Sequence, residues 1–259
     1  MGTEHNAVYL FVDHWPKEKI LEQIPDVYHQ YKNVGVDISK QPMEVYPSMH
    51  HMMGGVKVNE WGETNIPGLY ACGEVAGGVH GANRLGGNSI AEGQVFGRRS
   101  AISATKFARK QKAYSPKKLQ VSQEIERIEN FVTRKTGISP HEIESKLKKT
   151  MWDYVGIFRD EVRLSQAKRE IGQLETESRY MKTRNSDPRR NRDLQDALEI
   201  MNMLKTAKVI VTAALMRKES RGAHSRLDFP QTNKDWEKNI VVSLERNSLK
   251  TKLTPVVTL

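Results

Sequence analysis

The sequence has a single cysteine, Cys72, in 259 residues. One cysteine excludes an internal disulfide and a cysteine-based zinc site, and it suits a reducing compartment. No apolar run approaches the roughly eighteen residues of a membrane-spanning helix, and the N-terminus lacks the basic start of a secretory signal. The dinucleotide pattern GxGxxG and the P-loop pattern are both missing. These absences, with 37% hydrophobic and 28% charged residues, predict a soluble cytoplasmic protein.

Charge is unevenly distributed along the chain. Residues 1–100 carry 8 Lys and Arg against 11 Asp and Glu, whereas the rest carries 33 against 20. The basic residues concentrate at 106–112, 117–120 and 179–192. A solvated helix face, an acidic protein partner or a nucleic acid would each explain these runs. Because aromatic residues are not interleaved with them as base stacking requires, the pattern favours a solvated surface or a protein partner and predicts no nucleic-acid binding.

Short strand and helix signals alternate in the first part of the chain. Three runs have the composition of strands: 7–13, 56–58 and 69–73. A helical spacing after Trp15 is interrupted by Pro25. A long helix is predicted after Asn88, with small residues on a tightly packed side. Ser89 and Glu92 have the spacing of a capping box at its start.

From about residue 116 the apolar spacing is helical throughout. Four stripes at the helical period predict four helices, carried by residues 121–132, 143–154, 164–174 and 194–215. Ser139 and Pro140 form a strong start signal for the second helix, and Pro188 breaks the chain before the fourth. The short connections predict a small antiparallel bundle. Alternation of apolar and polar residues near the C-terminus predicts an extended tail that folds back on the rest of the chain as a strand.

Glycine is concentrated between residues 68 and 97, which hold nine of the chain's eighteen glycines. A strand, a glycine-rich turn and a helix start place backbone N–H groups and a helix dipole against an anion or an electron-rich ring edge. Without GxGxxG or a P-loop, the segment would contribute to a cofactor site but would not grip a diphosphate. Tight structural packing is the alternative explanation.

Three motifs carry a resemblance to a known family: HHMMGG at 50–55, GLYACGE at 68–74 and HGANRLGGNS at 80–89. They resemble the succinate dehydrogenase/fumarate reductase flavoprotein family, which includes L-aspartate oxidase. Residues 151–164 and 217–230 resemble the C-terminal helical domain of that family. The resemblance implies FAD as the cofactor and an α+β fold, in which a partial FAD-binding and capping-domain segment precedes an α-helical bundle domain.

The resemblance also implies domain boundaries. Residues 1–53 would form the end of the substrate-capping domain, and residues 54–112 the C-terminal part of the FAD-binding domain. Residues 113–225 would form the helical bundle, and residues 226–259 an extended tail packing on it.

Five site residues are implied by the same resemblance. His50 and Arg84 would bind a carboxylate of a C4 dicarboxylate substrate, which suits an imidazole and a guanidinium. Glu74 would accept hydrogen bonds from FAD hydroxyls. Ser89 and Ile90 would lie at the flavin ring, where backbone N–H groups stabilise negative charge on the reduced ring. No metal site is implied.

Four neighbouring residues have weaker assignments. His51 is a second candidate for the ligand role, which register assigns to His50. His80 and Asn83 are expected to shape the loop, and Cys72 is expected to fill the core of a buried strand.

Members of the family carry features that this sequence lacks. They have a GxGxxG that holds the FAD diphosphate, an arginine proton donor upstream of HxxMGG and further substrate ligands. The resemblance therefore implies the C-terminal part of a flavoprotein, without a catalytic residue of its own and inactive alone. It would supply FAD and dicarboxylate-binding residues for the interconversion of fumarate and succinate.

Partners follow from this interpretation. They are the N-terminal half of the flavoprotein, the dicarboxylate and an iron–sulfur subunit, with no direct membrane insertion. Contact with the cytoplasmic membrane face would run through partner subunits. Two alternatives stay open: a fragment of an L-aspartate oxidase, and a basic helical docking module for an iron–sulfur subunit with vestigial flavin residues.

Overall fold

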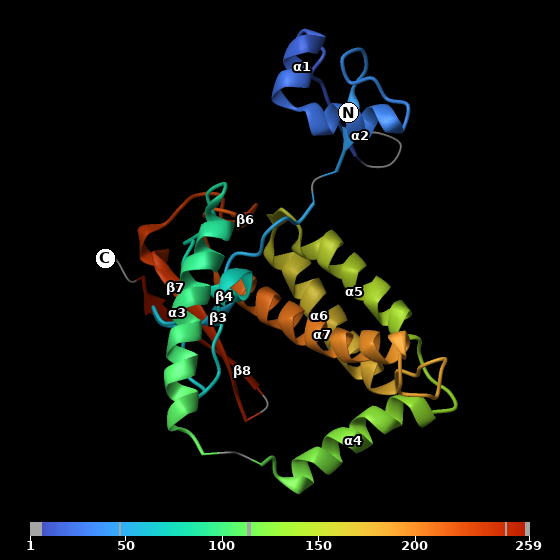
Figure 1. Cartoon of the computed structure of the whole chain (residues 1–259), viewed down its shortest axis with the longest axis vertical. Coiled ribbons are helices and arrows are strands. Elements are labelled where there is room, and N and C mark those ends of the chain that lie inside the picture. The colour runs from blue at the N-terminus through green and yellow to red at the C-terminus, as the bar shows by residue number, and fades with distance from the viewer. Residues whose placement is uncertain (1–6, 47, 113–114, 247, 257–259) are drawn as a thin grey trace. The chain divides into compact units, whose positions relative to one another are not determined.

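The computed structural model describes residues 7–46, 48–112, 115–246 and 248–256. The chain divides into two compact units, Met1–Met52 and Met53–Leu259 (Figure 1), and each is described by itself. Helices and small two-stranded sheets occur together, which confirms the predicted α+β class. Within the described residues, no helix is long and apolar enough to cross a membrane.

The first unit packs two short helices beside a two-stranded sheet. β1 (Val8–Leu10) pairs antiparallel with β2 (Met43–Val45). Between them lie α1 (Lys17–Gln23) and α2 (Pro25–Asn33). Pro25 is the first residue of α2, where a missing N–H costs nothing. The predicted interruption is therefore the point at which one helix ends and the next begins. The buried apolar residues of this unit include Ile20, Tyr28, Ile38 and Met43.

The second unit begins with short elements around the glycine motifs. β3 (Val56–Lys57) pairs parallel with β4 (Ala76–Gly77), which follows the one-turn helix η1 (Gly73–Val75). The predicted strand at 69–73 is wrong, because only Tyr70 forms an isolated bridge, to Glu63. Gly68 and Gly73 both have positive φ, which bends the backbone at each end of the segment. Cys72 is half-buried instead of filling a core strand.

The long helix α3 (Asn88–Lys110) forms as predicted, but its start differs. Gly87, at φ +81°, is the N-cap, and no side chain caps the helix. The predicted capping box is wrong because Ser89 already lies inside the first turn. Glu92 is buried, and its Oε1 accepts a hydrogen bond from the Gly73 N–H at 3.0 Å instead. The small-residue side is not tightly packed, since Ala91 and Ala101 are exposed and a Cβ on Gly93 would meet no atom within 4 Å.

All four predicted bundle helices are confirmed. They are α4 (Lys118–Thr133), α5 (Pro140–Val155), α6 (Glu161–Glu177) and α7 (Arg192–Met216). Ser139 and Pro140 are the N-cap and first residue of α5, as predicted, although the Ser139 side chain makes no cap hydrogen bond. Side-chain caps do occur at α6 and α7, where Asp160 accepts from the Arg163 N–H and Asn191 from the Leu194 N–H.

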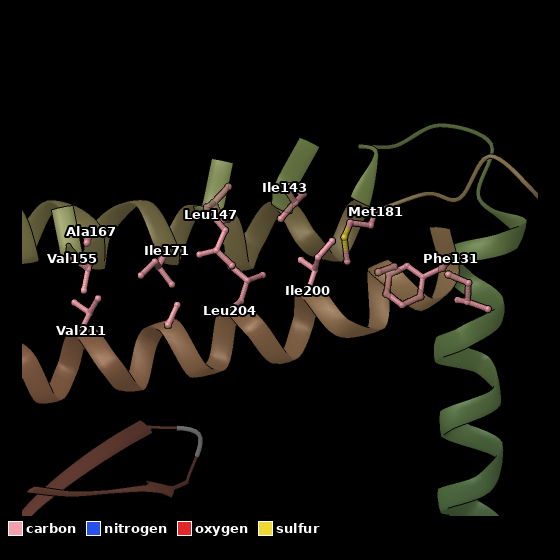
Figure 2. Close-up of a cluster of buried hydrophobic side chains, with 14 of the residues drawn as sticks. Phe131, Ile143, Leu147, Val155, Ala167, Ile171, Met181, Ile200, Leu204 and Val211 are labelled. Atoms are coloured by element: carbon pink, nitrogen blue, oxygen red, sulfur yellow. The ribbon is translucent and has the colours of Figure 1, made fainter. Parts of the chain in front are cut away.

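The hydrophobic core of the second unit lies between α5, α6 and α7 (Figures 1 and 2). Each helix contributes the stripe that its spacing predicted, including Leu147 of α5, Ile171 of α6 and Leu204 of α7. Burying such a side chain stabilises the fold by about 1.5–3 kcal/mol. On α4 the stripe is only half covered, because Val132 is buried whereas Ile125 is exposed.

Short strands and one-turn helices connect or follow the bundle helices, and a hairpin ends the described chain. β5 (Phe158–Arg159), which follows α5, pairs parallel with β6 (Ser225–Arg226). η2 (Ser178–Tyr180) follows α6, and η3 (Lys234–Trp236) precedes the hairpin. β7 (Lys238–Glu245) and β8 (Ser248–Pro255) pair antiparallel, so the extended tail is a hairpin and not a single strand. The assignment of these parts to named domains stays a prediction.

Candidate functional site

The two glycine-rich motifs run side by side at the start of the second unit. A Cβ on Gly55 would lie 2.2 Å from the Val75 carbonyl oxygen, and one on Gly77 would lie 2.7 Å from the Gly55 nitrogen. Gly55 also has a φ of +153°. Only glycine allows two backbone segments to approach this closely. Gly55 of HHMMGG and Gly77 after GLYACGE are therefore required by packing between the two segments.

Arg84 lies on the loop that leads from β4 into α3. Its backbone N–H donates to Met53 Sδ at 3.2 Å, and its Nη1 donates to the Leu85 carbonyl at 3.2 Å. Its Nε is buried and has no acceptor among the described residues. Leaving a buried donor unpaired costs about 1–3 kcal/mol. The guanidinium thus keeps a donor that no described residue pairs, and an added carboxylate would reach it once the atoms that cover Nε move aside.

The N-terminus of α3 is open. A Cβ on Gly86 or Gly87 would meet no atom within 4 Å, and no side chain caps the helix. Ser89 is half-buried, and Ile90 is 74% exposed in the first turn. The first N–H groups of a helix and its dipole favour negative charge. This open, uncapped helix start fits the electron-rich edge of a flavin ring.

The other two predicted site residues lie elsewhere. Glu74 lies in η1 with an exposed side chain, and η1 packs against α3. The second unit therefore holds four of the five: Arg84, Ser89 and Ile90 around the start of α3, and Glu74 on the element packed against it. His50 is exposed and belongs to the first unit. Within the described residues, no cluster of three or more His, Cys, Asp and Glu could hold a metal ion.

Two residues without a predicted site role connect the motifs. Met53 Sδ accepts a hydrogen bond from the Arg84 N–H, and Glu92 Oε1 accepts one from the Gly73 N–H. The position of Met53 in HxxMGG was the signal that could have identified it. Glu92 gave a misleading signal, because its spacing from Ser89 matches a cap.

A buried charged cluster lies in the segment after α7. Glu219 is fully buried and accepts hydrogen bonds from Arg217 at 2.6 Å, Arg221 at 2.9 Å and the Asn233 N–H at 2.9 Å. Burial alone would raise the pKa of Glu219. The hydrogen bonds from Arg221, the Asn233 N–H and Arg217 together hold that pKa below its ordinary value. The carboxylate is therefore charged at neutral pH.

His224, in the same cluster, is neutral at pH 7. Burial and, to a smaller extent, the positive charge of nearby Arg159 lower the pKa of His224 to about 4. Arg159 Nη1 lies 3.1 Å from His224 Nδ1, and a guanidinium can only donate. His224 Nδ1 is therefore the acceptor. The proton is on Nε2, which lies 3.4 Å from the Arg217 carbonyl.

The basic run at 179–192 is partly neutralised within the chain. Three of its arginines pair with aspartates, in Arg184–Asp193, Arg189–Asp187 and Arg192–Asp196. The predicted solvated surface accounts for these arginines.

Known proteins match the chain along most of its length. An FAD binding domain model matches residues 1–90, and the fumarate reductase flavoprotein C-terminal model matches residues 144–258. The chain is 45% identical over 242 residues to a fumarate reductase (CoM/CoB) subunit of Methanothermobacter marburgensis, covering 93% of this chain and 44% of that protein. It is 35% identical over 250 residues to L-aspartate oxidase 2-a, chloroplastic, of Nicotiana tabacum, covering 93% and 38%.

A solved structure from a fumarate reductase also matches the chain. A variant FrdA chain of E. coli quinol fumarate reductase matches with a TM-score of 0.92 and 29% identity, covering 100% of this chain and 46% of that one. The chain thus spans less than half the length of these relatives. The matches confirm FAD as the cofactor of the family, which is a family of FAD-dependent oxidoreductases. The chain belongs to the fumarate reductase/succinate dehydrogenase flavoprotein family, of which it is a partial flavoprotein.

Proposed function

We propose that the chain supplies the C-terminal part of a flavoprotein that interconverts fumarate and succinate. The observation that carries the proposal is Arg84, whose buried Nε lacks an acceptor among the described residues, on a glycine loop leading to an uncapped helix. A substrate carboxylate would supply the missing acceptor in a paired geometry. The 45% identity to a fumarate reductase protein supports this substrate class.

Each predicted site residue has one role in the proposal. Arg84 binds and polarises one carboxylate of the dicarboxylate, and His50 is a further carboxylate ligand. Glu74 accepts hydrogen bonds from FAD hydroxyls. The N–H groups of Ser89 and Ile90 favour negative charge at the ring edge. FAD, when bound, supplies the hydride chemistry, and the chain supplies binding and electrostatics, so that it is inactive alone.

Exposed apolar side chains support a partner that covers the glycine-rich segment. Five of them lie between residues 69 and 90: Leu69, Val75, Val79, Leu85 and Ile90. Apolar residues exposed in such number commonly mark an interaction surface. We assign this surface to the N-terminal half of the flavoprotein. An iron–sulfur subunit is a second proposed partner, and it would bring the chain to the cytoplasmic face of a membrane.

An L-aspartate oxidase is the second candidate, because the Nicotiana relative matches 93% of this chain. Aspartate carries the same two carboxylates as succinate, so Arg84 would serve either substrate. The lower identity, 35% against 45%, makes it the weaker candidate.

Arg84→Lys tests the proposal in a complex of this chain with the N-terminal half. Lysine keeps the charge but loses the planar fork that binds a carboxylate. We expect the variant to retain FAD and to raise the KM for fumarate about tenfold or more, since a hydrogen bond to a charged group contributes about 1.5–3 kcal/mol. The control is Arg99→Lys, because Arg99 is an exposed arginine of α3 that donates to the Glu60 carbonyl at 3.5 Å and lies over the Phe96 ring. Equal KM values for the two variants would contradict the proposal.

A further inference from the structure

A tight turn after α7 is the starting observation. Residues 221–224, called here the 221–224 turn, close with two backbone hydrogen bonds. The Arg221 N–H donates to the His224 carbonyl at 2.9 Å, and the His224 N–H donates to the Arg221 carbonyl at 3.0 Å. Gly222 at the tip has a φ of +58°, a conformation that side chains disfavour.

The 221–224 turn contacts the loop that carries Arg84. The Ala223 N–H donates to the Ala82 carbonyl at 3.2 Å. A Cβ on Gly222 would lie 2.2 Å from that oxygen and 2.5 Å from the Ala82 carbonyl carbon. Both neighbours are backbone atoms, so a larger residue could be accommodated only if the loop moved. The turn and the loop are therefore in full contact at this point.

The 221–224 turn is itself held on both sides by buried groups. Arg221 donates to the fully buried Glu219 at 2.9 Å. The neutral ring of His224 lies between Arg159, at 3.1 Å, and the Arg217 carbonyl, at 3.4 Å. These contacts fix the turn to the end of α7 and to β5, so that it acts as a rigid support.

The same loop is held from a second direction. Ala82 lies two residues before Arg84, whose N–H donates to Met53 Sδ at 3.2 Å. The backbone of residues 82–84 is thus anchored at one end by the bundle and at the other by HHMMGG. The direction in which the Arg84 side chain leaves the loop depends on both anchors.

We propose that the 221–224 turn is a positioning element that sets the location of Arg84 from the helical bundle. Gly222 and Ala223 are its contact residues, and both contact the backbone of Ala82. The proposal rests on the proposed function where it concerns substrate, because Arg84 is there the carboxylate ligand. A misplacement of about 1 Å in a binding group can change activity by up to a hundredfold.

Gly222→Ala tests the contact, with Gly35→Ala as the matched control. Gly35 also has a positive φ, +87°, but a Cβ there would meet no atom within 4 Å. The control therefore introduces backbone strain without the clash, and it lies in the first unit. The first measurement is amide hydrogen exchange of residues 80–87 in this chain. We expect exchange at least tenfold faster in Gly222→Ala and unchanged in Gly35→Ala.

The second measurement is steady-state kinetics of the FAD-loaded complex with the N-terminal half. Gly222→Ala is expected to raise the KM for fumarate about tenfold and to change kcat less than this. Its FAD content should equal that of the Gly35→Ala control. Unchanged exchange and an unchanged KM would overturn the proposal. If the unmodified complex turns over no dicarboxylate, the proposed function fails. The exchange result then decides the positioning role alone, with unchanged exchange overturning it.

A measurement on the unmodified complex covers the case in which Gly222→Ala does not fold. Because coupling between two sites is reciprocal, succinate bound at Arg84 should slow exchange of the Ala223 amide. We expect slowing of severalfold in 10 mM succinate, a concentration on the order of that used for weak ligands. No change at Ala223, with succinate binding shown by protection of residues 80–87, would overturn the proposal.

Discussion

Arg226 connects the two ends of adjacent bundle helices. The side chain is buried, and its Nε and Nη2 donate to the two carboxylate oxygens of Asp228, both at 2.7 Å. Its Nη1 donates to the carbonyls of Ala214 at 2.9 Å and Arg217 at 3.1 Å, at the end of α7. Asp228 also accepts from the Glu161 N–H at 3.0 Å, at the start of α6. One ion pair thus satisfies backbone groups at both helix ends.

Arg226→Met keeps the length of the side chain and removes every donor. Removing one partner of a buried ion pair costs about 3–5 kcal/mol, because the other partner is left uncompensated. Asp228 is 29% exposed, so water solvates part of its charge, and we expect a loss of about 3 kcal/mol in the free energy of unfolding. The control is Arg192→Met, because Arg192 pairs with Asp196 at 3.0 Å but is 77% exposed. An exposed pair of this kind contributes less than about 0.5 kcal/mol.

The effect of Arg226→Met should depend on pH. The hydrogen bond from Arg226 lowers the pKa of Asp228 from 3.8 to about 2. A carboxylate whose pKa is lower in the folded state than in the unfolded state stabilises the fold above its unfolded-state pKa. This stabilisation is lost as pH falls through its folded-state pKa. The difference between the unmodified chain and Arg226→Met should therefore shrink by about 2 kcal/mol between pH 4 and pH 2.

Urea unfolding followed by far-ultraviolet circular dichroism measures both effects. The two substitutions are compared at pH 7, and Arg226→Met is then compared with the unmodified chain across the acid range. If Arg226→Met and Arg192→Met differ by less than about 1 kcal/mol at pH 7, the structural reasoning is wrong. A stability difference that stays constant from pH 5 to pH 2 would refute the role given to Asp228.

Three further predictions follow from burial and charge. Burial and Arg159 lower the pKa of His224 to about 4. The free energy of unfolding should therefore fall by about 3 kcal/mol as pH drops from 6.5 to 4. In urea unfolding of His224→Gln, the free energy of unfolding should change less over the same pH range. Ile171→Ala should lower the free energy of unfolding by about 2–5 kcal/mol in thermal or urea unfolding, because Ile171 is buried in the bundle core. Val162→Ala, at a 78% exposed position of α6, should lower it by less than about 0.5 kcal/mol. Equal losses would contradict the core assignment. Ile90→Asp should weaken association with the N-terminal half by about tenfold or more, since it charges an apolar position at the proposed interface, and calorimetry that found unchanged affinity would remove that surface from the interface.

The bundle could be predicted from the sequence because its signals are local. In α5, α6 and α7 the apolar residues at the helical period are buried or half-buried, and Pro140 after Ser139 is a common pair at a helix start. The glycine-rich segment could not be predicted in the same way. Its conformation depends on the positive φ of Gly68, Gly73 and Gly87, and a sequence does not show which glycines adopt it. Glu92 shows the consequence, because a contact with Gly73 replaces the cap that its spacing predicted.

The candidate site was predicted from its motifs and not from periodicity. The motif HGANRLGGNS and the isoleucine that follows it predicted the roles of Arg84, Ser89 and Ile90, but the contacts that support this loop come from residues far away in the sequence. The contact of Ala82 with Gly222 and Ala223 joins loops from two ends of the second unit. No local sequence pattern predicts this contact, because it is made by backbone atoms of Ala82, Gly222 and Ala223. The roles of the site residues themselves stay predictions.

The central claim is that these residues complete a flavin and dicarboxylate site. The most direct measurement is to co-express the chain with the N-terminal half, reduce the purified complex and record its flavin absorbance as fumarate is added. The account predicts a yellow complex whose reduced flavin is reoxidised by fumarate under anaerobic conditions. A stable complex without flavin would contradict it and favour the docking-module alternative. A flavin-loaded complex that fumarate does not reoxidise would contradict the assignment of the substrate.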